Sequence, residues 1–291
     1  MTVIIGVHGV AQQQVGRHQL AGLWGPSLAD GVEAALSGGR AADLPFDLAY
    51  YGRLFLCADT SPASGSKAGG YEQDLADFVV VGVEKERELL AAAEEAAGAE
   101  ALRAGSEQTG KGYSRVPVPF QRVFRALDWR YGPGAALLFV GAFRQVRRYL
   151  REPELKAAID SVVDEAVTER CRVLVGHSLG SVVAFEFVRR HPERRLDLLL
   201  TLGSPLGARF VRALMPGAGH GAASLPPGVK AWVNVRDPRD PVTFSGDLRR
   251  WWPRVRDVTV DNGGDAHSAF RYLGKRQTGQ ALLEVLPELG G

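Results

Sequence analysis

Short apolar runs alternate along the chain with longer stretches in which apolar residues recur every three or four positions. The short runs, rich in Val, Ile and Leu, predict buried strands at residues 3–7, 48–56, 172–175, 196–202, 229–235 and 255–260. The longer stretches between them predict helices. This alternation indicates an α/β protein with a mostly parallel central sheet that is flanked by helices on both faces.

The predicted helices are bounded by Gly, Pro and capping residues. Helical spacing extends over residues 20–36, but Gly25-Pro26 interrupts it, so we expect the first helix to start at Ser27 as its N-cap. Further helices are predicted at residues 71–101, 120–151 (with an interruption at 132–134), 153–170, 179–190 and 269–286.

The predicted elements divide the chain into a core and an insertion. The core comprises residues 1–56 and 152–291, and the insertion comprises residues 57–151. The insertion lies between two core strands and is mostly helical by composition. An insertion of this length is expected to form a lid or cap over the functional site.

Composition and charge exclude several classes of protein. The formal net charge is +2, so no strong field requires a nucleic-acid partner. The apolar run at 131–143 is shorter than the roughly 18 residues of a membrane span. Cys57 and Cys171 lie far apart and no metal-ligand spacing occurs, so we expect no disulfide, metal or other cofactor. The chain opens with a core strand instead of a signal peptide, which predicts a cytoplasmic location.

The pentapeptide Gly176-His177-Ser178-Leu179-Gly180 carries the clearest chemical signal. It lies between a predicted strand and a predicted helix. A serine at such a sharp turn projects its hydroxyl from the sheet edge, and the glycines leave room for neighbouring backbone. The helix that begins there stabilises negative charge through its N-terminal dipole. This context predicts Ser178 as a nucleophile.

A serine hydroxyl needs a positioned base, and three histidines follow Ser178 in the chain. His267 lies in the loop between the last predicted strand and the last predicted helix, where the base of a Ser-acid-His series is expected. His191 ends a predicted helix, where an imidazole commonly meets the last carbonyls. His220 lies in a glycine-rich loop. We therefore predict His267 as the base, with His220 as the alternative.

The acid is expected after the penultimate strand, where both Asp237 and Asp240 occur. We favour Asp240, because the Asp-Pro-Val sequence that it begins can hold the carboxylate rigidly, whereas Asp237 is suited to capping a turn. The reverse assignment stays open. Either carboxylate would orient the imidazole of His267 and stabilise its protonated form.

Two backbone N–H groups are needed to bind a developing oxyanion. One is expected from Leu179, directly after the serine, and the other from Val10, in the turn that ends the first strand. Glycine in that turn lets the backbone approach closely. The residues expected to contact the substrate are His8, Gly9, His177 and Trp251.

Five short motifs occur in a familiar order. They are His8-Gly9-Val10, Gly176-His177-Ser178-Leu179-Gly180, Thr201-Leu202-Gly203-Ser204-Pro205, Asp240-Pro241-Val242 and His267-Ser268. This set resembles the lipase and esterase branch of the α/β-hydrolase superfamily, and the resemblance covers about two thirds of the chain, the core. It implies an α/β-hydrolase fold with a minimal sheet. It also implies hydrolysis of a small, lipid-like or lactone ester through an acyl-enzyme on Ser178, without cofactor or metal.

Two other functions stay open from the sequence. The same triad would serve an acyltransferase, a cyclase or an amidase, because the shape of the pocket selects the acceptor. A binding module with an idle triad is the second alternative, and it predicts that Ser178→Ala leaves the function intact. The Arg-rich, aromatic stretch within 120–151 is expected to present a solvated face, and transient membrane contact is the competing interpretation.

Overall fold

The computed structural model describes residues 3–12, 14–58, 83–107, 113–114, 116–215, 217 and 224–291. Its strands are β1 (Ile4–Val7), β2 (Phe46–Ala49), β3 (Val173–His177), β4 (Leu196–Leu202), β5 (Val229–Arg236) and β6 (Arg256–Thr259). Within the described residues they form one six-stranded sheet in the order β2-β1-β3-β4-β5-β6, and every neighbouring pair is parallel. This confirms the predicted α/β fold with a parallel central sheet.

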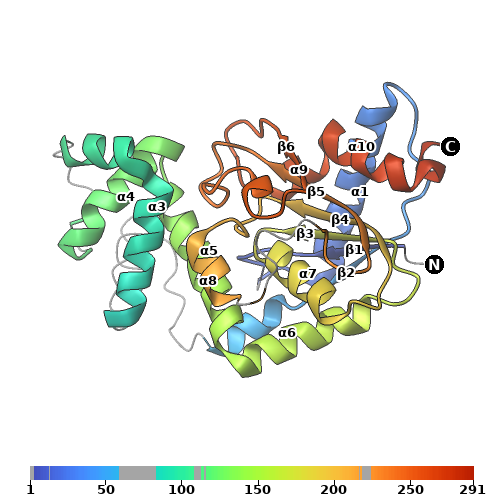
Figure 1. Cartoon of the computed structure of the whole chain (residues 1–291). Coiled ribbons are helices and arrows are strands. Elements are labelled where there is room, and N and C mark those ends of the chain that lie inside the picture. Colours follow the sequence, from blue (N-terminus) through green and yellow to red (C-terminus); the bar gives the residue numbers. More distant parts are fainter. Residues whose placement is uncertain are drawn as a thin grey trace.

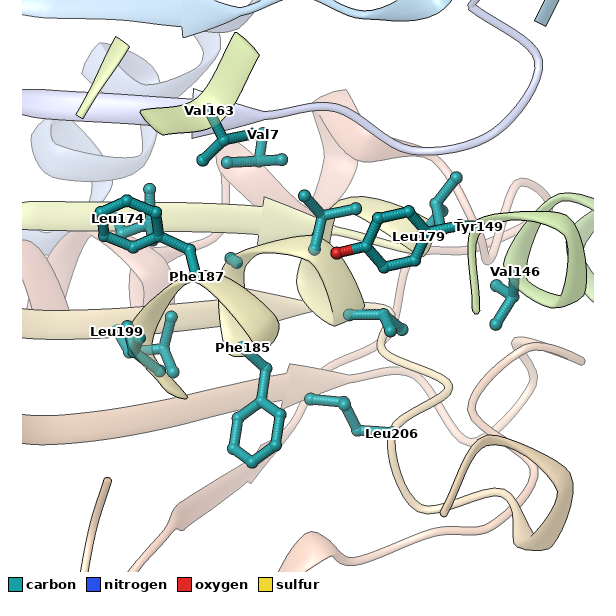
Figure 2. Packing of buried hydrophobic residues seen from close by; sticks show 14 of the residues in the cluster. Val7, Val146, Tyr149, Val163, Leu174, Leu179, Phe185, Phe187, Leu199 and Leu206 are labelled. Carbon is teal, nitrogen blue, oxygen red and sulfur yellow. The ribbon is translucent and has the colours of Figure 1, made fainter. Parts of the chain in front are cut away.

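Helices cover both faces of the sheet (Figure 1). On one face lie α1 (Arg17–Leu36), α9 (Ala269–Leu273) and α10 (Arg276–Val285), and on the other lie α6 (Pro153–Ala166) and α7 (Leu179–Arg190). Side chains of one strand alternate between the two faces of the sheet. In β3, Val173 and Val175 pack with α1 and α10, whereas Leu174 packs in the layer of α6 and α7 (Figure 2). Burial on both faces explains why the strands are continuous apolar runs in the sequence.

The first helix begins earlier than predicted. α1 continues through Pro26, so the expected start at Ser27 is wrong. Leu20, Trp24 and Leu28 are buried at four-residue spacing on one side of the helix. A proline inside a helix costs about 3 kcal/mol, whereas burying an apolar side chain of this size stabilises by roughly 1.5–3 kcal/mol. The burial of the residues that precede the proline therefore outweighs the loss at the proline.

The second strand is shorter than predicted. β2 ends at Ala49, so the expectation of a strand over residues 48–56 is wrong beyond that point. A short 3₁₀ helix, η1 (Gly52–Ala58), follows instead. Tyr51 and Phe55 are both buried and their ring centres are 6.3 Å apart, whereas four residues of extended strand would span about 13 Å. The turn brings the Tyr51 ring onto the imidazole of His8, directly after β1.

The other predicted elements that the structure describes are largely confirmed. α7 and β4 have the predicted bounds. The Gly-Pro-Gly sequence separates α4 (Val118–Tyr131) from α5 (Ala135–Arg151), as expected. The last predicted helix is divided into α9 and α10 at Gly274-Lys275, and α6 ends at Ala166, before residue 170.

Of the helices between β2 and β3, α6 packs on the sheet, whereas α3 (Val83–Glu107) and α4 lie beyond one end of it and α5 connects the two parts (Figure 1). α3, bent at Gly98, packs with α4 and α5 around a hydrophobic cluster of their own. Phe210 and Phe244 of the core pack against this cluster. The first part of the helix predicted at 71–101 lies outside the described residues. Among the helices that the structure describes, none is long and apolar enough to cross a membrane.

The direction of the connections changes between β1 and β3, which are neighbours in the sheet. β1 leads into α1 on one face, whereas β3 leads into α7 on the opposite face (Figure 1). In open α/β sheets, ligands bind beyond the carboxyl ends of the strands at such a switch point. The fold therefore points to residues 8–10 and 176–180 as the centre of a site.

Candidate active site

Ser178 lies at the turn between β3 and α7 in a strained backbone conformation. Its φ of 55° and ψ of −125° fall in a region that residues with a side chain rarely adopt. A Cβ on Gly176 would lie 2.5 Å from the carbonyl oxygen of Gly180, and a Cβ on Gly180 would overlap the carbonyl oxygen of Val7. The two glycines thus allow β1, β3 and α7 to meet closely around the serine.

Hydrogen bonds join Ser178, His267 and Asp240. Nε2 of His267 lies 3.0 Å from Oγ of Ser178, and Nδ1 of His267 lies 2.7 Å from Oδ2 of Asp240. A carboxylate only accepts hydrogen bonds, so Nδ1 carries the proton of the neutral ring. Nε2 is then left to accept the proton of the Ser178 hydroxyl, which is the arrangement of a nucleophile with its base.

Asp237, the alternative acid, has other partners. Its carboxylate accepts hydrogen bonds from the backbone N–H of Arg239, at 2.8 Å, and from that of Asn262. These bonds connect the loop after β5 to the loop after β6, which carries His267. Asp237 therefore shapes the two loops, and Asp240 is the carboxylate that contacts the imidazole.

The two other histidines that follow Ser178 in the sequence are His191 and His220. His191 lies at the end of α7, where its ring nitrogens are 3.1 Å from carboxylate oxygens of Asp164 and Glu193. His220 lies outside the described residues. Of the histidines that the structure describes after Ser178, it is His267 that contacts the serine hydroxyl.

The register of β1 and β3 brings Gly9 against the serine. Val7 is opposite Gly176 in the parallel pair, so Gly9 and Ser178, each two residues further on, come together. A Cβ on Gly9 would lie 2.7 Å from the Cβ of Ser178 and 2.9 Å from the carbonyl oxygen of His177. A larger residue at position 9 would therefore displace the turn or the serine.

His8 fixes this turn through both of its ring nitrogens. The backbone N–H of Tyr51 donates to Nε2 at 3.1 Å, so the proton lies on Nδ1, which donates to the carbonyl of Gly9 at 2.9 Å. Burial lowers the pKa of His8 to about 4, which keeps the ring neutral. Both nitrogens have partners inside the protein, and the expected contact of His8 with a substrate stays a prediction.

The hydrogen bond from His8 also sets the direction of the next amide. In a trans peptide the C=O and the N–H point in opposite directions. Because the carbonyl of Gly9 is directed at His8, the N–H of Val10 is directed away from it. Within the described part of the chain, the backbone N–H groups of Val10 and Leu179 form no hydrogen bond. These are the two donors that the sequence predicts for an oxyanion, and that of Leu179 begins α7, where the helix dipole adds positive potential.

His177 links the serine turn to the loop of the base. Its Nε2 donates to the carbonyl oxygen of His267 at 3.0 Å, and the two ring centres are 4.7 Å apart. Burial, and then the neighbouring imidazole, lower the pKa of His177 well below its usual value, so this ring is neutral. His177 thus has a partner within the protein, and its predicted contact with the substrate stays a prediction.

A small apolar cavity lies between α5 and the segments that follow β4 and β5. It is lined by Phe139, Ala142, Phe143, Val146, Pro205, Phe210, Val242 and Phe244. Val242 connects the cavity to the hydrogen-bonded series, because its N–H donates to Oδ1 of Asp240 at 2.8 Å. Val146 and Leu179 belong to the same hydrophobic cluster (Figure 2). The cavity therefore adjoins the loop that carries Asp240.

Trp251, which the sequence predicted as a substrate contact, is not one of the residues that line this cavity. Its ring packs where a Cβ on Gly207 would lie, and the guanidinium of Arg212 covers it, 4.5 Å from the ring centre. Trp251 is partly buried at the edge of the hydrophobic cluster, and its predicted contact with a substrate stays a prediction.

The site is closed and carries one residue that the sequence did not reveal. Ser178 and Asp240 are fully buried and His267 is 8% exposed, so a substrate must displace covering residues to enter. Tyr272 of α9 contacts Oδ2 of Asp240 through its hydroxyl, at 2.9 Å. In the sequence it is an ordinary position of the last predicted helix. Among the described residues, no three His, Cys, Asp or Glu side chains are grouped so that they could hold a metal ion.

No protein-family model matches this chain, and a search of curated proteins found no match either. The fold and the geometry of the site are therefore the basis on which a function can be assigned.

Proposed function

We propose that this protein is a serine hydrolase of the α/β-hydrolase type that cleaves a carboxylic ester. The observation that carries the proposal is the hydrogen-bonded series from Ser178 through His267 to Asp240, with distances of 3.0 and 2.7 Å. The three residues follow β3, β6 and β5, and their order along the chain is Ser, Asp, His, as the α/β-hydrolase resemblance implies. The strained φ of Ser178 supports the same conclusion, because such strain persists mainly where function requires it.

In the proposed reaction, Oγ of Ser178 attacks the ester carbonyl carbon while Nε2 of His267 takes the hydroxyl proton. Asp240 holds the ring and stabilises the imidazolium that forms. The tetrahedral intermediate collapses, the C–O bond to the alcohol breaks, and Nε2 returns the proton to the departing alcohol. A water molecule, deprotonated by His267, then attacks the acyl-enzyme and releases the acid and free Ser178.

The negative charge of the tetrahedral intermediate needs donors at a fixed position. We assign them to the N–H groups of Val10 and Leu179, which lie on the two sides of the switch point and are not otherwise bonded within the described residues. One such donor is typically worth about 3–4 kcal/mol of transition-state stabilisation. Both belong to backbone that His8 and α7 hold in place, so little reorganisation is needed during the reaction.

The cavity beside the Asp240 loop has room for about one water molecule in this closed form, and once it widens its lining favours an apolar acyl group. Four phenylalanines surround it, with Phe139 against Phe244 at 5.7 Å and Phe143 against Phe210 at 4.7 Å between ring centres. No charged side chain is among its lining residues. A carboxylate on the acyl group would lose its hydration there without gaining a partner, at a cost of several kcal/mol. We therefore expect alkanoyl esters to be better substrates than esters of dicarboxylic acids.

The test is a p-nitrophenyl ester panel with acetyl, butyryl, hexanoyl, palmitoyl and succinyl groups. We expect hydrolysis of the alkanoyl esters, slow turnover of the succinyl ester, and a loss of about 10⁴-fold or more in Ser178→Ala. Ser161→Ala, on the exposed side of α6, is the matched control and should retain the wild-type rate. A fluorophosphonate probe should label the wild type and the control, and should leave Ser178→Ala unlabelled.

Two results would contradict the proposal. Hydrolysis that persists in Ser178→Ala would exclude this serine as the nucleophile. Absence of both hydrolysis and labelling in a folded wild-type protein would favour the alternative of a binding module with an idle triad.

A further inference from the structure

Tyr272 makes two hydrogen bonds that place it between the two aspartates of the loop after β5. Its hydroxyl oxygen is 2.8 Å from the backbone nitrogen of Asp237 and 2.9 Å from Oδ2 of Asp240. The side chain is fully buried and comes from α9, five residues after His267. Tyr272 thus connects the loop of Asp240 to α9, the helix that follows His267.

The direction of each bond follows from the donor inventory. The N–H of Asp237 can only donate, so it occupies a lone pair of the Tyr272 oxygen. The phenolic proton is then left for Oδ2 of Asp240. Burial, and then the charge of Asp240, raise the pKa of Tyr272 far above its usual value, so the hydroxyl keeps that proton. Oδ2 is also the oxygen that accepts from Nδ1 of His267, so it receives two hydrogen bonds.

We propose that Tyr272 is a positioning residue that aims the Asp240 carboxylate at His267 and, by donating to the shared oxygen, lowers the proton affinity of the imidazole. A carboxylate oxygen that already accepts a strong donor carries less charge for the ring it faces. Its stabilisation of the imidazolium is correspondingly weaker, and the base stays unprotonated to lower pH. The consequence for turnover rests on the proposed hydrolase function, whereas the effect on the imidazole does not.

The other titratable groups around the pair do not account for such an effect. His177 faces His267 from the end of β3, and its pKa is well below the usual value. Tyr131 of α4 interacts electrostatically with Asp240, but burial raises the pKa of Tyr131 to about 12, so its hydroxyl stays neutral. Asp237, also from the loop after β5, directs its carboxylate to backbone amides.

The shared oxygen, Oδ2 of Asp240, lies in a tightly packed place. A Cβ on Gly203, after β4, would lie 2.9 Å from the ring of Tyr272 and 3.1 Å from Oδ2 of Asp240. Oδ1 of the same carboxylate accepts from Val242 N–H at 2.8 Å. The carboxylate is therefore held at both oxygens, and Tyr272 supplies the contact on the side of the base.

The experiment compares Tyr272→Phe with Tyr149→Phe. Tyr149 is the matched control because it is also fully buried and also donates to a carboxylate, Oδ1 of Asp160 at 2.7 Å, at the contact of α5 with α6. Protonation of the His267 ring is followed by NMR, with the resonance assigned from its loss in His267→Gln. The acid limb of the pH profile of kcat/KM is measured in parallel.

For Tyr272→Phe we expect the NMR midpoint of His267 and the acid limb to move to higher pH by about 0.5–1 unit. We also expect kcat/KM at its optimum to fall by about tenfold. Tyr149→Phe should change neither. Unmoved midpoints together with a uniform loss of activity would overturn the proposal and leave Tyr272 a merely structural role.

A second replacement guards against misfolding of the Phe variant. Fluorotyrosine in place of Tyr272 keeps the shape and both hydrogen bonds but is a stronger donor, so the midpoint of His267 should move to lower pH. An unchanged or higher midpoint would refute the proposal. If the wild type has no esterase activity, the proposed function fails, and the NMR midpoints still decide the role of Tyr272.

Discussion

Gly9→Ala tests the geometry of the site most directly. Gly9 does not have a positive φ, so alanine can adopt the same backbone and only the added methyl group matters. That methyl carbon would lie 2.7 Å from the Cβ of Ser178, whereas ordinary contact begins at 3.4 Å. The two groups must therefore separate by roughly 0.7 Å, and the methyl group also meets the carbonyl oxygen of His177 at 2.9 Å.

The expected effects on the activation free energy and on the free energy of unfolding are of similar size. A displacement of about 1 Å in a catalytic constellation costs roughly 100-fold in rate, which corresponds to about 2.7 kcal/mol of activation free energy. Overpacking by one methyl group typically lowers the free energy of unfolding by about 1–3 kcal/mol. In a protein of this size that lowers the melting temperature by roughly 2–4 °C for each kcal/mol. The variant should therefore be folded at 25 °C and catalytically poor.

The assay is kcat/KM on p-nitrophenyl butyrate at 25 °C, with thermal unfolding recorded on the same samples. Gly16→Ala is the control from the same loop, because a Cβ on Gly16 would meet no atom within 4 Å and its φ of −77° suits any residue. We expect Gly16→Ala to keep the wild-type kcat/KM. A folded Gly9→Ala with wild-type kcat/KM would refute the close approach of the first turn to the serine.

Two further predictions follow from the same contacts. Asp240→Asn should lower kcat by about 10³–10⁴-fold, because an amide at this position favours the wrong tautomer of the His267 ring. Asp237→Asn should mainly lower the free energy of unfolding, by about 1–3 kcal/mol. If kinetics and urea unfolding show the opposite pattern, Asp237 is the acid. The pKa of His8 is lowered to about 4 in the folded protein, so between pH 6.5 and pH 4 the unfolded chain binds a proton at His8 that the folded protein does not. The folded state therefore becomes less stable relative to the unfolded state as the pH falls through this range. In urea unfolding, the free energy of unfolding should fall by about 2 kcal/mol between pH 7 and pH 5 because of His8. This fall should be smaller in His8→Gln and unchanged in the control His18→Gln, whose side chain is exposed. An undiminished fall in His8→Gln would exclude the buried imidazole as its source.

The hydrogen-bonded series was predictable because parallel strands place their carboxyl ends on one edge of the sheet. Ser178, Asp240 and His267 each follow a strand that the apolar runs predicted, so strand order alone brings them near one another. The choice between Asp237 and Asp240 was not decided by sequence, because both follow β5 within four residues. It depends on which carboxylate the backbone amides of the loop occupy, and that is a property of the folded loop.

The early end of β2 has a cause that lies far away in the sequence. The expected strand over residues 48–56 would have carried Tyr51 along the sheet, whereas the chain turns into η1 directly after it. That turn presents the N–H of Tyr51 to His8 and lets the Tyr51 hydroxyl donate to the His8 carbonyl. The local pattern of the sequence does not show this long-range contact between His8 and Tyr51, and the expected contact of His8 with a substrate stays a prediction. Turns that end a strand early are set by tertiary burial, which local propensity does not report.

The strand order also explains why the proposed oxyanion donors come from segments that are far apart in the sequence. Val10 follows β1 and Leu179 follows β3, and the helical insertion separates the two strands in the chain. Because β1 and β3 pair with Val7 opposite Gly176, the residues that leave these strands in opposite directions remain in contact for two positions beyond the sheet. The N–H groups of Val10 and Leu179, which form no hydrogen bond within the described residues, follow these two paired strands. A slip of one residue in the β1–β3 register would move Gly9 away from Ser178, so the pairing register itself is a requirement of the proposed chemistry.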